Sequence, residues 1–251
     1  HVTIERILAH APEQLFFLLY KNCTNGCLFC PLTYNPNYSH YTWEKIQDRI
    51  AENVLYKIQS VNFTTSCPKG KTQDELVEEI IDIATKTRKL LGMDITLGAS
   101  LKTPSIENLL RLKDAGICEI RLNLETYNSE VAQCIMPNKD LNKILYSIEQ
   151  AVTVFGKEKV SSNIIIGLGE SDDDILNGVC KLAEIGALST LYPYDSIGLS
   201  NYNFQRPSAK RIYNLAIEHK KILKKHNLNP LGSKTMCCAC AASHLYPGKD
   251  I

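Results

Sequence analysis

The 251-residue sequence lacks several features that would assign it to a class at once. It contains no apolar run that approaches the roughly 18 residues of a membrane span. Its formal net charge is only +1, with acidic and basic residues interspersed, which argues against the broad positive surface of a nucleic-acid-binding protein. No secretion signal opens the chain, which begins with His1. We therefore expect a cytoplasmic protein whose partners are small molecules or proteins, with neither membrane nor nucleic acid among them.

Cysteine, in contrast, is abundant, with ten residues in the chain. Disulfide scaffolds are typical of short secreted proteins, so metal binding is the better interpretation in a long chain without a secretion signal. A cysteine that stands alone is usually a small core residue. Four of the ten stand alone in this way: Cys67, Cys118, Cys134 and Cys180. The other six fall into two groups, one near each end of the chain.

Short β-branched or aromatic segments alternate with longer segments of helical periodicity. Strands are predicted at 14–20, 61–65, 94–97, 119–124, 160–166 and 188–192, and helices at 42–59, 72–91, 105–115, 141–155, 172–185 and 208–226. Six consecutive βα units require a parallel sheet with right-handed crossovers. The predicted fold is therefore an α/β partial (β/α)6 TIM-like barrel, with ligands at the carboxyl ends of its strands. Residues 1–230 would form the barrel, and residues 231–251 a cysteine-containing tail that closes its mouth.

The first cysteine group, "CTNGCLFC", directly follows the first predicted strand and contains Cys23, Cys27 and Cys30. A structural zinc site wants four protein ligands, and a redox CxxC motif needs only two thiols, so neither accounts well for three. A [4Fe–4S] cluster held by three cysteines leaves one iron free to bind a substrate or cofactor. We therefore predict that these three cysteines hold such a cluster and are the catalytic centre.

This segment resembles the CxxxCxxC signature of radical S-adenosylmethionine (radical SAM) enzymes, including the aromatic Phe29 before the third cysteine. The resemblance implies that the open iron binds the amino and carboxylate groups of SAM and that SAM is cleaved to a 5′-deoxyadenosyl radical. It also implies that Phe29 lies near the adenine. The cofactor would then supply the difficult chemistry, and the protein would position the reacting carbon.

Two later segments extend the resemblance. "NIIIGLGES" looks like the family's G-x-I-x-G-x-x-E motif on the fifth strand, with Ile165, Gly167 and Glu170 in register, although Asn163 replaces its first glycine. An ordinary strand-to-helix turn would also explain these glycines. "IRLNLET" is similar to the fourth strand of biotin synthase, which implies that Asn123 and Glu125 bind the SAM ribose. A solvated strand face is the alternative for this segment.

The second cysteine group, "KTMCCAC", contains Cys237, Cys238 and Cys240. Cys237 and Cys240 have metal-ligand spacing, and Cys67 is predicted to point into the same barrel mouth. We therefore predict an auxiliary [4Fe–4S] cluster with ligands drawn from Cys237, Cys238 and Cys240, and with Cys67 as a further candidate; the spacing does not decide which of the four bind. A small zinc site, or a tail with incidental cysteines, is the alternative.

A radical SAM barrel with a second, C-terminal cluster resembles the sulfur-inserting enzymes, and this tail looks most like the two-component lipoyl synthases of archaea and anaerobes. The resemblance implies sulfur insertion at C6 or C8 of an octanoyl group on a carrier protein, with a second radical SAM subunit and a small electron-donor protein as partners. The alternatives are an anaerobic-type biotin synthase and a radical SAM cofactor maturase without sulfur insertion. A non-catalytic iron–sulfur or zinc module would leave Asn123, Glu125, Gly167 and Glu170 without a shared reason.

Overall fold

The computed structural model describes residues 13–34, 39–53, 57–195, 204–240 and 245–251, except the side chains of Met236 and Cys240. Its centre is a six-stranded parallel sheet in which the strands follow one another in chain order. The strands are β1 (Gln14–Leu18), β2 (Ser60–Thr64), β3 (Thr96–Ser100), β4 (Ile117–Arg121), β5 (Val160–Ile166) and β6 (Leu188–Pro193). The predicted α/β fold with six parallel strands is thereby confirmed.

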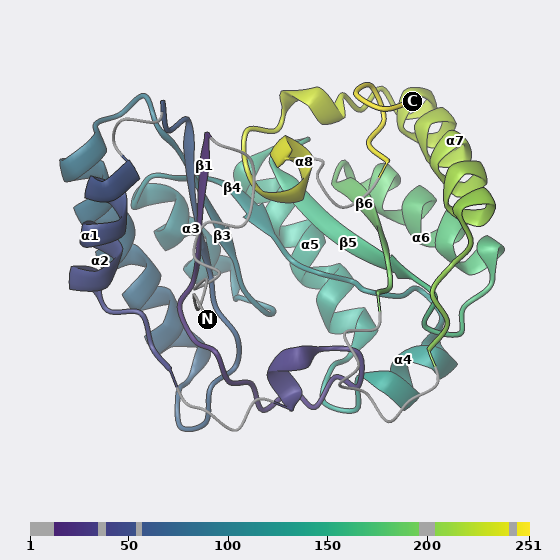
Figure 1. Cartoon of the computed structure of the whole chain (residues 1–251), viewed down its shortest axis with the longest axis horizontal. Coiled ribbons are helices and arrows are strands. Elements are labelled where there is room, and N and C mark those ends of the chain that lie inside the picture. The colour runs from purple at the N-terminus through teal and green to yellow at the C-terminus, as the bar shows by residue number, and fades with distance from the viewer. Residues whose placement is uncertain (1–12, 35–38, 54–56, 196–203, 241–244) are drawn as a thin grey trace, which may run out of the picture.

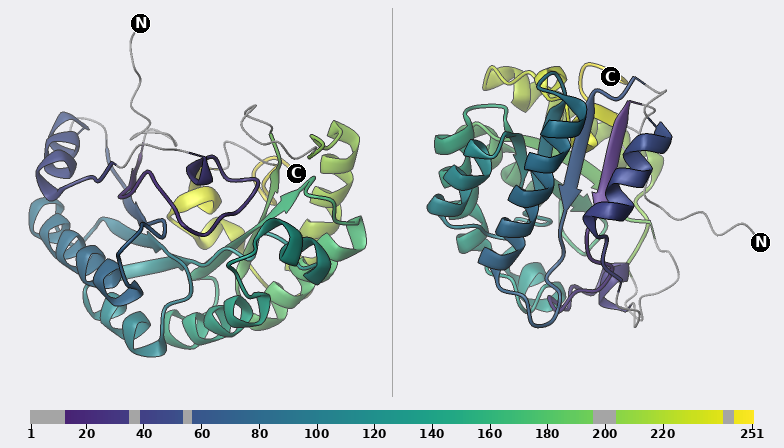
Figure 2. Two further views of the ribbon diagram at one scale, coloured as in Figure 1. Left: turned by 90° about the horizontal axis from the view of Figure 1, so that it is seen from below. Right: turned by 90° about the vertical axis from the view of Figure 1, so that its left-hand side faces the viewer.

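Helices cover the convex face of the curved sheet (Figures 1 and 2), and its two edge strands, β1 and β6, pair with no further strand of the described residues. The sheet therefore forms an open part of a barrel, and its concave face encloses what we call the lumen. The longer helices are α1 (Trp43–Asn53), α2 (Gln73–Leu91), α3 (Ile106–Asp114), α5 (Leu141–Phe155), α6 (Asp172–Ile185) and α7 (Ala209–Lys225). Shorter ones are α4 (Ser129–Ile135), α8 (Met236–Cys240) and the 3-10 turns η1 (Pro31–Thr33) and η2 (Pro230–Gly232).

The apolar core lies between sheet and helices, because alternate strand residues point to opposite faces. On β2, Val61 and Phe63 are fully buried in this core. Ser60, Asn62 and Thr64 alternate with them and face the lumen. A parallel strand is usually apolar on both faces, so these polar residues mark the lumen as the functional side of the sheet.

The helix boundaries follow local chemistry. At the start of α2, Thr72 and Glu75 form a capping box, and Ser171 and Asp174 form another at the start of α6. The helix α6 ends at Gly186, which adopts the left-handed conformation that glycine allows without a side-chain clash. These signals explain why the predicted ranges 72–91 and 172–185 agree closely with the structure.

Other boundaries differ from the prediction. The predicted helix 42–59 ends earlier, because residues 57–59 are not helical and 54–56 lie outside the described residues. The strand β3 continues past Gly98 to Ser100, although glycine usually weakens a strand interior. Neither α4 nor α8 was predicted. In the described part of the chain, no helix is both long and apolar enough to cross a membrane.

The C-terminal tail lies inside the barrel instead of covering the mouth at the strand ends. Figures 1 and 2 place α8 within the lumen, away from the loop that carries Cys23, Cys27 and Cys30. The Glu119 carboxylate on β4 accepts hydrogen bonds from the backbone N–H groups of Lys234 and Thr235, at the start of α8. The expectation that the tail closes the mouth is therefore corrected: a buried acceptor in the middle of β4 draws the start of α8 into the barrel.

Candidate active site

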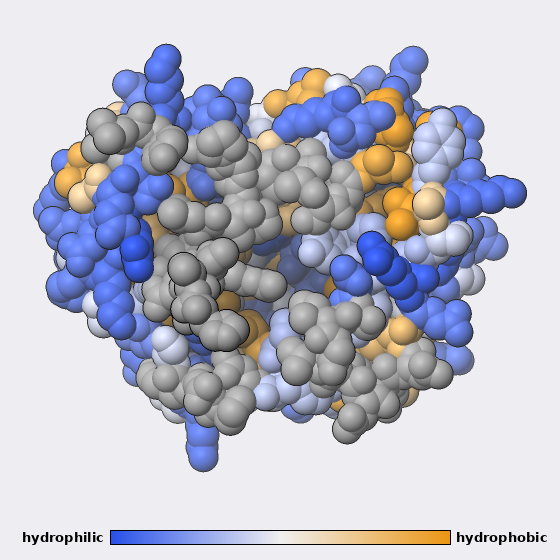
Figure 3. Space-filling model, viewed as in Figure 1, coloured by the Kyte–Doolittle hydropathy of each residue, from blue (hydrophilic) through white to orange (hydrophobic). Residues whose placement is uncertain are grey.

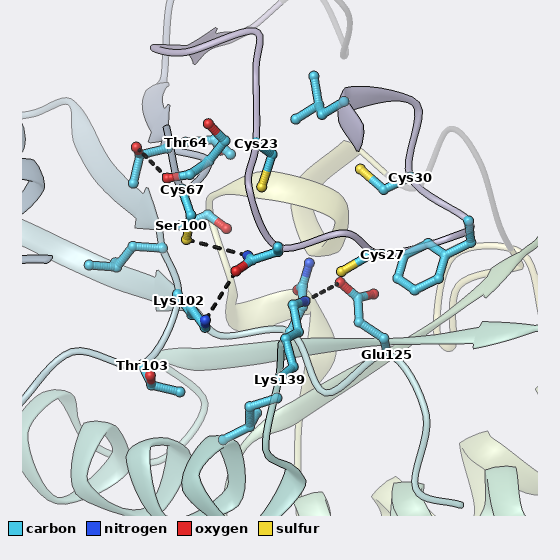
Figure 4. A pocket seen from close by; sticks show the side chains of 18 residues that line it. Cys23, Cys27, Cys30, Thr64, Cys67, Ser100, Lys102, Thr103, Glu125 and Lys139 are labelled. Atoms are coloured by element: carbon cyan, nitrogen blue, oxygen red, sulfur yellow. Dashed lines mark hydrogen bonds and ion pairs between the residues drawn. The ribbon is translucent and has the colours of Figure 1, made fainter. Parts of the chain in front are cut away.

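The three N-terminal cysteines lie on one loop after β1, which we call the cluster loop (residues 23–30). Gly26 allows its turn with a φ of 67°, a conformation that other residues rarely adopt. Backbone hydrogen bonds from Leu28 N to Ile135 O (2.9 Å) and from Cys30 N to Cys27 O (3.1 Å) fix the loop at the carboxyl end of the barrel. Figure 4 shows the sulfur atoms of Cys23, Cys27 and Cys30 turned toward one space.

This space is the cluster pocket, which is lined from several strand ends. It combines thiols, hydroxyls, amides and two lysines. Its lining includes Cys23, Asn25, Cys27, Phe29, Cys30, Thr64, Cys67, Ser100, Lys102, Asn123, Glu125 and Lys139. Cys23, Cys27, Phe29, Cys30, Asn123 and Glu125, which the sequence motifs singled out, thus meet around one pocket.

The thiols differ in how readily they lose a proton. A hydrogen bond from the Cys67 thiol is the main cause that lowers the pKa of Cys23, to about 5. The same contact raises the pKa of Cys67. Burial raises the pKa of Cys27 to about 11 and also raises the pKa of Cys30. Coordination to a metal would reverse these last two shifts, because a metal-bound thiol is deprotonated.

A buried ion pair lies beside the thiols. Lys139 Nζ is 3.5 Å from Glu125 Oε1, and both side chains are about nine-tenths buried. Burial opposes the charge of Lys139, but the neighbouring Glu125, Cys27 and Cys30 outweigh it and raise its pKa. A positive charge is therefore held next to the cysteines, where it can offset the negative charge of bound thiolates. No sequence motif marks Lys139, which follows a turn after α4 and meets the cluster loop only in three dimensions.

Glu125 also has an unusual backbone. Its φ is 68°, its N–H donates to Asn163 O and its carbonyl accepts from Ile165 N, both at 2.8 Å. Such strain in a residue other than glycine is typical of functional sites. We expect Glu125→Gly to be more stable than Glu125→Ala by about 1 kcal/mol, because only the alanine keeps the strain of a Cβ at positive φ. Both variants lose the pair with Lys139 equally, so the difference between their urea midpoints measures the backbone alone.

Glu130, in the first turn of α4, is the matched control for this comparison. At this helical position the order reverses, because glycine costs about 1 kcal/mol relative to alanine in a helix. Equal stabilities of Glu125→Gly and Glu125→Ala would show that the positive φ stores no strain.

Asn123 and Asn163 hold each other in the lumen. Asn163 N donates to Asn123 Oδ1 at 3.3 Å, and Thr190 Oγ1 donates to Asn163 Oδ1 at 2.5 Å. The strand β4 ends at Arg121, so Asn123, which the predicted strand 119–124 included, and Glu125 both lie beyond its end. The backbone N–H of residue 163 orients Asn123, and a glycine, which the family motif has at this position, carries the same donor.

Gly167 and Glu170 occupy a second pocket, next to Phe204 and Arg211, and not the cluster pocket. The Glu170 carboxylate accepts from Gly167 N at 2.8 Å and Leu168 N at 2.7 Å, and it pairs with Arg211 at 3.2 Å. A Cβ on Gly167 would lie 2.5 Å from Gln205 O. Both residues therefore have a structural reason in their own loop, and their contact with the cofactor stays a prediction. Ile165 packs beside Cys27 and Tyr194, at the edge of the cluster loop.

Of the four residues predicted to hold an auxiliary cluster, the three whose side chains are described are not gathered in one place. Cys67 lies beside Cys23, and Cys238 is fully buried with Tyr246 and Leu188 in an apolar cluster. Cys237 is within 2.7 Å of Arg121 Nη1, in the lumen. Adjacent residues on a helix point in different directions, which separates Cys237 from Cys238. The side chain of Cys240 lies outside the described part of the chain.

The residues around the cluster pocket fit a [4Fe–4S] cluster by their chemistry. Thiolates are the soft ligands that such clusters require, and three of them surround the pocket. Lys139 supplies a nearby positive charge. In the described residues no group of three cysteine, histidine or acidic side chains stands close enough to hold a single metal ion.

Three thiols meet at the carboxyl ends of a partial parallel barrel. The class of protein is therefore an α/β barrel with a cysteine-rich cofactor site. The model of the radical SAM superfamily matches residues 17–177 of the 251-residue chain. The chain therefore belongs to the radical SAM superfamily. Membership implies a [4Fe–4S] cluster and SAM as cofactors.

Curated relatives are similar over part of their length. Biotin synthase of Hydrogenobaculum sp. is 28% identical over 211 residues, which cover 80% of this chain and 56% of the relative. GTP 3′,8-cyclase of Aliarcobacter butzleri is 27% identical over 157 residues, which cover 61% of this chain and 46% of the relative. The chain thus spans about half the length of the curated relatives it matches.

Solved structures share the fold. The FeFe-hydrogenase maturase HydG from Carboxydothermus hydrogenoformans superposes with a TM-score of 0.69 at 16% identity, covering 85% of this chain and 52% of HydG. Methylornithine synthase superposes with a TM-score of 0.64 at 15% identity, covering 82% of this chain and 62% of that enzyme. At such identities the likeness concerns the fold.

Proposed function

We propose that this chain cleaves SAM at a [4Fe–4S] cluster held by Cys23, Cys27 and Cys30 and transfers sulfur to an unactivated carbon of its substrate. When bound, the cluster supplies the electron that converts SAM to a 5′-deoxyadenosyl radical. The chain's own residues bind and orient the cofactor. Asn123 and Glu125 face the pocket with the amide and carboxylate groups that hydrogen-bond ribose hydroxyls, and Phe29 offers an aromatic face for the adenine.

The position of Cys237 supports the sulfur-transfer part of the proposal. Thr64, Ser100, Arg121 and Ser161 are register partners on β2 to β5 and so lie at one level of the barrel. Thr64 and Ser100 line the cluster pocket, whereas Arg121 donates to Cys237 Sγ. The thiol on α8 therefore contacts a residue in register with two residues that line the cluster pocket, which supports an auxiliary cluster on that side of the pocket.

The lumen also offers donors for the anionic sulfur of an auxiliary cluster. Arg121 Nε, Asn62 Nδ2 and Thr64 Oγ1 are buried without a hydrogen-bond partner. Buried polar atoms are normally paired, so these groups indicate a polar or anionic occupant. An auxiliary cluster on α8 would be such an anionic occupant if Cys237 and another tail cysteine were its ligands.

An octanoyl group on a carrier protein is the substrate we propose to test first, because the tail is similar to that of lipoyl synthases. A second radical SAM subunit and a small electron-donor protein would be partners. The aliphatic side chains that line the cluster pocket, Leu32, Leu101 and Ile144, can pack against an alkyl chain.

Cofactor maturation without sulfur insertion is the second candidate, and the polarity of the lumen favours it. Asn62, Ser100, Arg121, Asn163 and Thr190 line the inner face of the sheet, and polar side chains suit a polar substrate better than an alkyl chain. One relative, GTP 3′,8-cyclase, is named for GTP, which is a polar molecule.

Anaerobic reconstitution separates the two candidates. Parent protein, Cys237→Ala and the control Cys180→Ala are loaded with iron and sulfide, and SAM plus reductant is added. Sulfur transfer requires about eight irons in the parent and control, and about four in Cys237→Ala, because each [4Fe–4S] cluster holds four. All three proteins should release 5′-deoxyadenosine, and only the parent and control should thiolate an octanoyl-lysyl peptide. Equal iron in parent and Cys237→Ala would exclude sulfur transfer from a cluster on α8 and leave the maturation candidate.

A further inference from the structure

Cys67 lies in the cluster pocket, and the structure gives it contacts there that the motifs do not explain. It lines the pocket together with Cys23, Cys27 and Cys30. Its carbonyl and its sulfur accept hydrogen bonds from Thr24 and Asn25 of the cluster loop. Figure 4 shows it on the side of the pocket next to Cys23, where β2 ends. The pocket thus contains four thiols, although the family motif accounts for three.

We propose that Cys67 is the fourth thiolate ligand of the cluster when SAM is absent, and that SAM displaces it on binding. This inference rests on the proposed cluster at Cys23, Cys27 and Cys30. It assigns to Cys67 the iron that those three cysteines leave open. Cys67 then protects the resting cluster and makes its exposure depend on SAM.

The backbone holds Cys67 against the cluster loop. Thr24 N donates to Cys67 O at 2.8 Å, and Thr24 Oγ1 donates to the same oxygen at 2.9 Å. The residue after the first cluster cysteine is therefore tied to Cys67 by two hydrogen bonds. This connection keeps the Cys67 thiol beside the loop.

A second contact orients a donor toward the Cys67 sulfur. Asn25 Nδ2 donates to Cys67 Sγ at 3.3 Å, while Asn25 Oδ1 accepts from Lys102 Nζ at 3.0 Å. Because the lysine can only donate, it fixes which end of the amide faces the sulfur. Lys102 also donates to Asn138 O at 3.0 Å and so stays in place. The Asn25 amide, held by Lys102, therefore fixes the position of the Cys67 sulfur beside the cluster loop.

The exchange needs no electron. A thiolate is a soft ligand and binds an open iron better than water does. On SAM binding, the amino and carboxylate groups of SAM would replace the Cys67 sulfur at the open iron, and Cys67 would take up one proton from solvent. Asn25 would hold the released Cys67 sulfur through the hydrogen bond from its amide.

The experiment compares parent, Cys67→Ala, Cys67→Ser and the control Cys180→Ala, each reconstituted anaerobically. Without SAM, mild oxidation by ferricyanide removes an iron that lacks a protein thiolate, and electron paramagnetic resonance detects the resulting [3Fe–4S] cluster. We expect this conversion to be about tenfold or more faster in Cys67→Ala than in parent and control, comparable to losing a supporting group of a metal site. Cys67→Ser should fall between them, and saturating SAM should remove the difference.

SAM affinity gives an independent readout. Because SAM need not displace a ligand in Cys67→Ala, this variant should bind SAM about tenfold more tightly than the parent. Equal oxidation rates and equal affinities in parent and Cys67→Ala would overturn the assignment of Cys67, while the cluster and SAM cleavage would stand. Failure of the parent to bind a cluster or cleave SAM would instead overturn the proposed function itself.

Discussion

Cys27→Ala is expected to lose the SAM-binding cluster and to stop the release of 5′-deoxyadenosine almost completely. Cys27 is 5% exposed, and it lines the pocket between the cluster loop and the Lys139–Glu125 pair. Loss of a group that merely supports a metal ligand costs about 10- to 100-fold, so loss of a direct ligand should cost more than about 100-fold. Iron content should fall by about four per chain, the content of one [4Fe–4S] cluster.

Cys27→Ala should change the fold and its stability little, because alanine removes one sulfur atom from the loop and leaves its backbone hydrogen bonds in place. Circular dichroism should therefore match the parent. Cys180→Ala, on α6 and away from the pocket, is the matched control and should keep both iron and activity. Undiminished iron in Cys27→Ala would mean that the three cysteines of the loop do not hold the cluster.

The sequence predicts the sheet well because its signals are local. Phe63 and Val61 alternate with polar residues, and capping boxes at Thr72 and Ser171 mark helix starts. Parallel βα units then leave little freedom in strand order. The exact ends are less predictable. Beyond Arg121 the chain stays alongside β5, but Ser162 Oγ accepts the hydrogen bond from Leu124 N in place of a backbone partner.

The cysteine motif of the first group was recognisable because its ligands lie within eight residues of one loop. The second group shows the limit of spacing arguments. Cys237 and Cys238 are neighbours in sequence, yet one meets Arg121 in the lumen and the other is buried against Tyr246. Cys67 has no nearby cysteine in sequence, and only the parallel pairing of β1 with β2 brings it to Cys23. These contacts between residues far apart in the sequence depend on the tertiary structure.

Two lysines show that the roles of charged residues are also hard to predict from the sequence alone. Lys102 and Lys139 look like ordinary basic residues in the sequence. In the structure both line the cluster pocket, where one orients Asn25 and the other pairs with Glu125. Asn25 is 77 positions away from Lys102 in the chain, and α4 lies between Glu125 and Lys139. A charged residue becomes informative only when its burial and its partner are known.

Glu119→Ala is expected to release the C-terminal tail from the lumen and to destabilise the protein. Glu119 is 3% exposed on β4, and its carboxylate accepts hydrogen bonds from Ser233, Lys234 and Thr235 and pairs with Lys159. Without it these donors lie buried and unsatisfied. Each such donor costs about 1–3 kcal/mol, so we expect a loss of about 3 kcal/mol or more in the free energy of unfolding.

The release can be measured directly by hydrogen exchange and mass spectrometry. Peptides that contain residues 233–240 should exchange much faster in Glu119→Ala than in the parent, while peptides from α2 should change little. Lys159→Ala is the matched control, because it removes only the partner that is 41% exposed. A half-exposed ion pair contributes about 1 kcal/mol or less, so this variant should keep the tail in place.

The result for Glu119→Ala also tests what holds Cys237 in its place. Arg121 and Glu119 lie on the same face of β4, two residues apart, and contact successive parts of the tail. If Glu119 anchors the start of α8, then Cys237 meets Arg121 only while this anchor is intact. Glu119→Ala should then lose the protection of residues 233–240 and, with it, the iron of the proposed auxiliary cluster. Unchanged exchange in that segment would mean that apolar packing of Cys238 and Tyr246 holds the tail without the carboxylate.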